Sequence, residues 1–99
     1  KKASNLVMPD FMRIGGVTGW INSAAIAGTG GIPISTHFYP EVGSHVMRVS
    51  QTAHWLEWLD WANDILLDPF TVIDGHVQIP NKPGIGIEWN EKVVNKYRI

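Results

Sequence analysis

Two short apolar runs, each followed by a turn and a helix-like segment, constrain the fold of this chain most strongly. The first run, residues 6–8, leads to Asp10 and a glycine-rich turn, and the second, residues 32–34, leads to His37. Repeated strand-helix units are typical of a parallel sheet covered by helices. Because the carboxyl ends of parallel strands meet at one edge, we expect Asp10 and His37 to converge there.

The spacing of apolar residues predicts a helix after each run. Thr18 is a suitable N-cap for the first helix, which we expect to end within the glycine-rich stretch 28–31. The second helix is predicted to begin at Pro40 and Glu41, because proline and acidic residues are favoured in a first turn. The apolar face of the first helix is expected to hold Trp20, Ile21, Ala24, Ala25 and Ile26. That of the second is expected to hold Val42, His45, Val46 and Val49.

A third strand is predicted at residues 53–59, a short aromatic-rich run with Glu57 at or near its carboxyl end. In a parallel barrel the carboxyl ends of all strands face the same way, so that residues one strand-helix unit apart can reach one site. We therefore expect Asp10, His37 and Glu57 to share a site.

The pattern changes beyond Asp60, where prolines and glycines become frequent. Residues 70–79 are predicted to form a hairpin around Asp74-Gly75, a pair that favours a type I′ turn. Residues 84–89 are predicted to be an extended closing segment.

Length and composition restrict the class of protein. The chain has 99 residues and no initiator Met before Lys1, whereas a parallel barrel needs roughly 250 residues, so we expect a C-terminal fragment. A net charge of −1 with scattered Lys and Arg argues against a nucleic-acid partner. No apolar stretch approaches the roughly 20 residues of a membrane span. The absence of cysteine excludes disulfides and thiolate zinc sites within the chain, and we expect a cytoplasmic protein.

Five motifs in order carry a resemblance to a known family: residues 8–20, 35–37, 53–57, 83–87 and 96–97. Together they closely resemble the mandelate racemase subgroup of the enolase superfamily. The resemblance implies an α/β fold, the C-terminal portion of a modified TIM barrel of the (β/α)7β type. Residues 1–68 or so would hold strand-helix units and the last barrel strand, and residues 69–99 a C-terminal tail with the hairpin. The N-terminal capping domain and the earlier strands would lie outside this chain.

The resemblance also implies a chemistry, the removal of the proton α to a substrate carboxylate held on Mg²⁺. His37 matches the general base or acid, Asp10 the carboxylate that orients it, and Glu57 an acid that donates to a substrate carboxylate oxygen. Phe38 and Leu59, which flank these residues, are candidates for the substrate pocket. The outcome is either dehydration of a sugar acid or racemisation of a 2-hydroxy acid.

The family's Mg²⁺ ligands and its Lys-x-Lys pair would precede Lys1, so the resemblance implies no metal ligand in this chain. We therefore expect the chain alone to be inactive, and the full-length parent to be a homo-oligomer that acts on a small carboxylate. A barrel that lacks its earlier strands should expose a sheet edge and apolar helix faces, which favour oligomerisation or aggregation of the chain.

Other interpretations of the same residues stay open. On spacing alone, Asp10 could cap a turn, His37 could be a packed or surface histidine, and Glu57 a solvated acid. His37 and Glu41 have the spacing of metal ligands but no third donor. Two departures from the pattern of mandelate racemase, Tyr39-Pro40 and Trp58, favour a sugar-acid dehydratase. The alternative function is a catalytically inactive scaffold that acts as a binding or assembly module.

Overall fold

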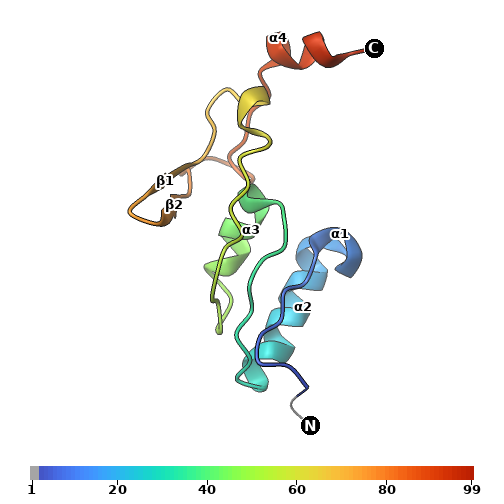
Figure 1. Cartoon of the computed structure of the whole chain (residues 1–99), viewed down its shortest axis with the longest axis vertical. Coiled ribbons are helices and arrows are strands. Elements are labelled where there is room, and N and C mark those ends of the chain that lie inside the picture. The colour runs from blue at the N-terminus through green and yellow to red at the C-terminus, as the bar shows by residue number, and fades with distance from the viewer. Residues whose placement is uncertain (1–2) are drawn as a thin grey trace. The chain divides into compact units, whose positions relative to one another are not determined.

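The computed structural model describes residues 3–99, and Figure 1 shows the order of their helices and strands. The chain divides into two compact units, one that ends at Trp58 and one that runs from Leu59 to Ile99. The first unit contains α1 (Phe11–Ile14), α2 (Gly16–Thr29) and α3 (Pro40–Met47).

Three extended segments of the first unit pair in parallel, as predicted. Isolated bridges join Val7 to Ile34, Asp10 to His37, and Ile34 to Ala53. Ile34 pairs with both neighbours, so the segment that holds it lies in the middle. The third segment is shorter than the predicted strand at 53–59, because its backbone pairing gives way to a side-chain hydrogen bond at Glu57.

The first helix begins earlier than predicted, and Thr18 lies inside it rather than at its N-cap. Asp10 caps the single turn of α1, and Gly15 then takes a left-handed conformation with φ of +87°. Because a residue with a Cβ adopts this conformation only at a steric penalty, glycine suits the junction. The chain re-enters a helix at Gly16, two residues before Thr18.

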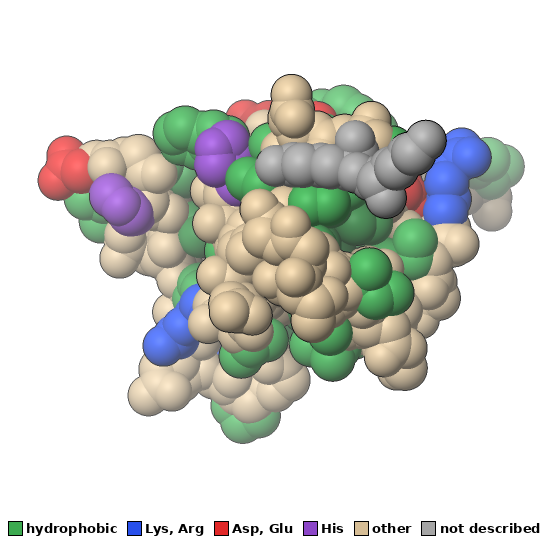
Figure 2. Space-filling view, turned by 90° about the horizontal axis from the view of Figure 1, so that it is seen from below, with side chains coloured by type: hydrophobic (Ala, Val, Ile, Leu, Met, Phe, Trp, Pro, Cys, Tyr) green, Lys and Arg blue, Asp and Glu red, His purple; other side chains and the backbone are tan. Residues whose placement is uncertain are grey.

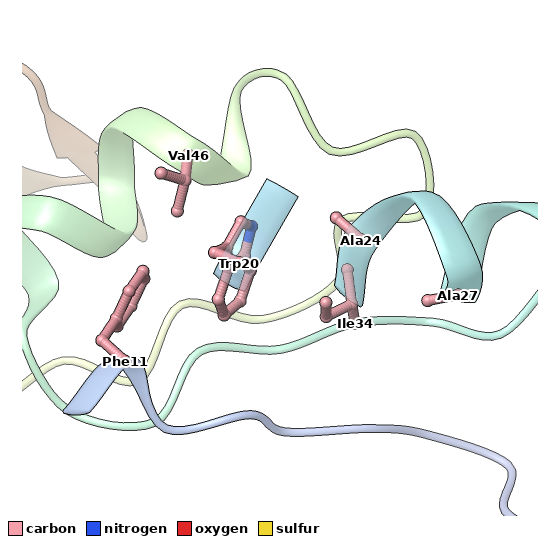
Figure 3. Packing of buried hydrophobic residues seen from close by; sticks show 6 residues of the cluster. All are labelled: Phe11, Trp20, Ala24, Ala27, Ile34 and Val46. Carbon is pink, nitrogen blue, oxygen red and sulfur yellow. The ribbon is translucent and has the colours of Figure 1, made fainter. Parts of the chain in front are cut away.

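The core of the first unit surrounds Trp20, which is completely buried (Figure 3). Its ring stacks on Phe11 with 4.8 Å between centroids. Its indole N–H donates to Ser50 Oγ at 2.9 Å, so that the one polar atom of the ring is satisfied. The remaining buried apolar members of this cluster are Ala24, Ala27, Ile34 and Val46.

The predicted apolar faces are partly wrong. In α2 the buried positions are Trp20, Ala24 and Ala27, whereas Ile21, Ala25 and Ile26 are exposed. The helical period of 3.6 residues explains this, because a residue next to a buried one turns about 100° away from it. In α3, Val46 is buried and Val42 and His45 are half-buried, as predicted. Val49 is exposed because the helix ends at Met47.

The second unit contains η1 (Asn63–Ile65), β1 (Thr71–Ile73), β2 (His76–Gln78), α4 (Glu91–Val94) and η2 (Asn95–Tyr97). The predicted hairpin is confirmed: β1 and β2 are antiparallel, and Ile73 pairs with His76 across the turn. Asp74 and Gly75 both have positive φ angles, as a type I′ turn requires.

The predicted extended segment at 84–89 is wrong in its first half, residues 84–86, whereas the Glu88 carbonyl accepts from the backbone N–H of Leu67 at 2.9 Å. Gly84 and Gly86 have positive φ angles, in a turn and in the bend that follows it, and Trp89 forms an antiparallel bridge to Leu66. Glycine permits the left-handed conformations that bend the chain here.

Large apolar side chains reach the surface of the molecule, and Figure 2 shows one face on which they do so at several places. Met12 in α1, together with Val17 and Ile26 in α2, is at least half exposed. The expected exposure of apolar helix faces is therefore observed. Within residues 3–99, every helix is too short or too polar to span a membrane.

Candidate active site

The middle extended segment positions His37 by alternation. Ile34 and Thr36 are completely buried on the side that faces the helices. Successive side chains of an extended chain point to opposite sides, so His37 is directed away from Thr36. Its side chain retains 36% of its accessible surface. The fold thus offers an imidazole at the carboxyl end of a parallel segment.

Asp10 and His37, which are joined by a parallel bridge, also form a hydrogen-bonded pair through their side chains. Asp10 Oδ2 lies 2.8 Å from His37 Nδ1, and the Asp10 side chain is 15% exposed. The other carboxylate oxygen, Oδ1, accepts from the backbone N–H groups of Met12 at 2.8 Å and Arg13 at 3.2 Å. Each oxygen of Asp10 therefore has its own role.

The surroundings of Asp10 favour its ionised form. The hydrogen bond with His37 lowers the pKa of Asp10 below its ordinary value of 3.8, and the N–H groups of Met12 and Arg13 act in the same direction, while desolvation opposes them. An ionised carboxylate can only accept hydrogen bonds, so Nδ1 of His37 must carry the proton. In the neutral ring, Nε2 then has the lone pair and can act as a base.

Glu57 joins this edge through two hydrogen bonds. Its backbone N–H donates to Thr36 Oγ1 at 2.8 Å, and its carboxylate Oε2 accepts from the backbone N–H of Phe38 at 2.6 Å. The ring of Phe38 in turn lies 4.1 Å from the His37 ring, edge to face. The three predicted residues are thus brought to one place, with Phe38 between His37 and Glu57.

Thr36 is a contributor that sequence reasoning missed. In the sequence it is only one residue of the run that ends in His37, yet its hydroxyl accepts the backbone N–H of Glu57. The available signal was a hydroxyl residue at a position where alternation predicts burial, since a buried hydroxyl needs a partner.

Leu59, by contrast, is the first residue of the second unit, and its place in a substrate pocket stays a prediction. The same holds for substrate contact by Phe38.

The residues that the structure describes do not fit a metal site of their own. Among residues 3–99, no three His, Cys, Asp or Glu side chains lie close enough together to hold a metal ion. His37 and Glu41, despite their spacing, therefore lack a third donor in the part of the chain that the structure describes.

Comparison with curated proteins shows similarity to acid-sugar dehydratases. The chain is 36% identical to D-gluconate dehydratase of Thermoproteus tenax over 95% of its own length and 21% of that protein. It is 29% identical to L-talarate/galactarate dehydratase of Salmonella typhimurium over 91% of its length and 23% of that protein. The chain therefore spans between a fifth and a quarter of these relatives.

Solved structures agree with this similarity. An enolase from an alpha proteobacterium, bal199, with bound Mg superposes with a TM-score of 0.92 at 61% identity, over 95% of this chain and 26% of that one. An enolase from Bradyrhizobium complexed with magnesium and mandelic acid gives a TM-score of 0.91 at 49% identity, over 98% of this chain and 27% of that one. Residues 1–93 match the family described as Enolase C-terminal domain-like. The predicted fold class is thus confirmed, and the chain belongs to the Enolase C-terminal domain-like family.

Proposed function

We propose that this chain supplies the proton-transfer pair of an enzyme that removes the proton α to the carboxylate of a small acid. The observation that carries the proposal is the 2.8 Å hydrogen bond between Asp10 and His37 at the carboxyl ends of adjacent parallel segments. It fixes the tautomer in which His37 Nε2 is a base, while the ring remains partly exposed.

The proposed step transfers one proton. The α C–H bond breaks, the proton goes to His37 Nε2, and the electron pair passes into the carboxylate to give an enediolate. Asp10 stabilises the imidazolium that results and keeps the ring oriented. In a dehydration, the imidazolium returns the proton to the β-hydroxyl as its C–O bond breaks, and water leaves. The enol that results tautomerises to a 2-keto acid. In a racemisation, the carbon regains a proton on the opposite face from another group.

Glu57 is the proposed donor to the substrate carboxylate. Support comes from its place next to Phe38, the residue that directly follows His37. A group that donates a hydrogen bond where negative charge develops stabilises the enediolate more than the ground state. Its protonated form could donate in this way.

A magnesium ion is part of the proposal for the whole enzyme. The two solved enolases described above contain the metal, which in such chemistry would neutralise charge on the substrate carboxylate. Its ligands would come from polypeptide outside this chain.

The proposed substrate is a 2-hydroxy acid, either a sugar acid or an aryl acid. Sugar acids are favoured by the named curated relatives, both dehydratases, and by the L-talarate dehydratase of Polaromonas solved with Mg and L-glucarate, 26% identical. An aryl acid is favoured by the Bradyrhizobium complex with mandelic acid. We propose further that the whole enzyme is cytoplasmic and homo-oligomeric.

The test is exchange of the α-proton in D₂O, followed by NMR with the complete gene product and Mg²⁺. D-gluconate, L-glucarate and mandelic acid are the probes. With the accepted substrate, His37→Asn should slow exchange by about a hundredfold or more. His76→Asn, in the hairpin, is the matched control and should exchange at the unaltered rate.

The product separates the two reactions. A 2-keto acid identifies a dehydratase, and loss of optical rotation without a new carbonyl group identifies a racemase. Exchange that is equally fast in His37→Asn would contradict the proposed base. Absence of exchange with every probe would favour the alternative, a scaffold that acts as a binding or assembly module.

A further inference from the structure

Two consecutive left-handed residues follow directly after His37. Phe38 has φ of +56° and Tyr39 has φ of +53°. Neither is glycine, asparagine or aspartate, the residues that tolerate this conformation most readily. Tyr39 also precedes Pro40, whose ring further restricts the residue before it. Such a pair persists only where surrounding contacts hold it.

The contacts that hold the pair come from three directions. The Glu57 carboxylate accepts the Phe38 N–H at 2.6 Å. The Tyr39 carbonyl accepts from the backbone N–H groups of Val42 and Gly43, at 3.1 and 2.8 Å, at the start of α3. The Tyr39 and Phe11 rings pack edge to face, with 6.5 Å between centroids. The turn is therefore tied to the neighbouring extended segment, to a helix and to the core.

The ring of Phe38 transmits this restraint to the imidazole. It packs edge to face on His37, with 4.1 Å between centroids and 66° between the planes. Asp10 restrains the imidazole separately, through Nδ1. Rotation of His37 about its χ2 angle would break one of these contacts or the other.

We propose that Phe38 is a positioning residue, whose left-handed backbone, held by the Glu57 carboxylate, and whose ring, packed on His37, together fix the direction of His37 Nε2. The inference rests on the proposed function in one respect, that His37 transfers a proton. It adds that Glu57 has a structural task as the acceptor of the Phe38 N–H. The proposed base His37 and the proposed acid Glu57 are thereby coupled through Phe38.

The experiment uses two variants of the complete gene product. Phe38→Gly removes the ring and lets the backbone of residue 38 adopt other φ angles as readily as the left-handed one. Phe38→Leu removes the aromatic contact but retains an apolar side chain. Asp74→Gly is the matched control, because Asp74 is another non-glycine residue with a positive φ, +48°, and lies in the hairpin. The spectroscopic readout is the ¹⁵N NMR signal of the His37 ring, assigned by its loss in His37→Asn.

We expect the wild-type ring to show one tautomer with a proton on Nδ1, and both Phe38 variants to show averaged or broadened ring signals. In the exchange assay kcat should fall by about tenfold to a hundredfold, with KM changed less than about threefold. The reason is that a misplaced catalytic group slows the chemical step more than it weakens substrate binding. Asp74→Gly should leave both readouts unchanged.

An unaltered ring signal in both Phe38 variants would overturn the inference, as would equal changes in Asp74→Gly. If Phe38→Gly fails to fold, the Phe38→Leu variant decides alone. If the wild-type protein exchanges no α-proton, the proposed function fails, whereas the ring signals still decide whether Phe38 positions His37.

Discussion

One carboxylate oxygen of Asp10 accepts a hydrogen bond from His37 at 2.8 Å while the other caps helix α1. The start of the helix and the orientation of the imidazole therefore depend on the same side chain. A change that tilts α1 would move Asp10 Oδ2 and so disturb the hydrogen bond that it accepts from His37 Nδ1.

Asp10→Asn should make the free energy of unfolding depend less on pH in the acidic range. The folded-state pKa of Asp10 lies below its ordinary value of 3.8. Ionised Asp10 therefore stabilises the fold at pH values above that value, and this contribution is lost as pH falls through the lower folded-state pKa. Asparagine retains a cap oxygen but does not titrate.

Thermal midpoints measured from about pH 6 to about pH 3 check this. Asp74→Asn is the matched control, since asparagine also tolerates a left-handed conformation. A wild-type profile no steeper than that of Asp10→Asn over this range would contradict the prediction.

Gly43→Ala should destabilise the protein by about 1–3 kcal/mol, because the added methyl overpacks the core. A Cβ at Gly43 would lie 3.0 Å from Thr36 Cγ2 and 3.1 Å from Leu56 Cδ1. The control is Gly30→Ala, whose Cβ would meet Ile32 at an ordinary 3.4 Å. Denaturant midpoints of the two variants give the comparison, and equal midpoints would show that residue 43 has room.

Trp20→Phe should cost about 1–3 kcal/mol, partly through the lost hydrogen bond to Ser50 Oγ at 2.9 Å. Ser50→Ala should cost a similar amount, because it leaves the buried indole N–H without its acceptor. The double variant should lose less than the sum, with a coupling of about 0.5–3 kcal/mol. Chemical denaturation of all four proteins measures this cycle, and strict additivity would argue against the bond.

Glu57→Ala should accelerate hydrogen exchange of the Phe38 amide by about tenfold or more, because the N–H loses its acceptor. Glu57→Gln should exchange nearly as slowly as the wild type, since its amide oxygen can accept the same bond. Glu41→Ala, on α3, is the control and should leave this amide unaffected. Mass-spectrometric exchange on peptides that span residues 36–40 resolves the three variants. Fast exchange already present in the wild type would contradict the contact.

Local patterns predicted much of the fold. The parallel approach of Asp10 to His37 followed from two strand-helix units, and the hairpin followed from Asp74-Gly75. Both depend on signals contained within a few residues. The start of α2 did not follow, because capping by Asp10 and the left-handed Gly15 displaced the expected cap at Thr18.

The convergence of Asp10, His37 and Glu57 was predictable from the sequence, but the contacts that hold them near one another were not. Asp10, His37 and Glu57 follow from motif resemblance, and their proposed roles await the assays above. The left-handed pair after His37 could not be foreseen, because its residues are not those that ordinarily adopt it. Contacts from the distant residues Glu57 and Phe11 accompany this conformation, and such tertiary contacts leave no local pattern.

The double use of Asp10 has an evolutionary consequence. A descendant of this protein that lost the proposed proton transfer would still need an acceptor at the start of α1. Selection for folding alone could then preserve the aspartate for long periods after gene duplication. In surveys of genomes, an aspartate at this position is therefore weak evidence that a protein is an active enzyme. Replacement of His37, which caps no helix among residues 3–99, would be the earlier sign that the proposed activity has been lost.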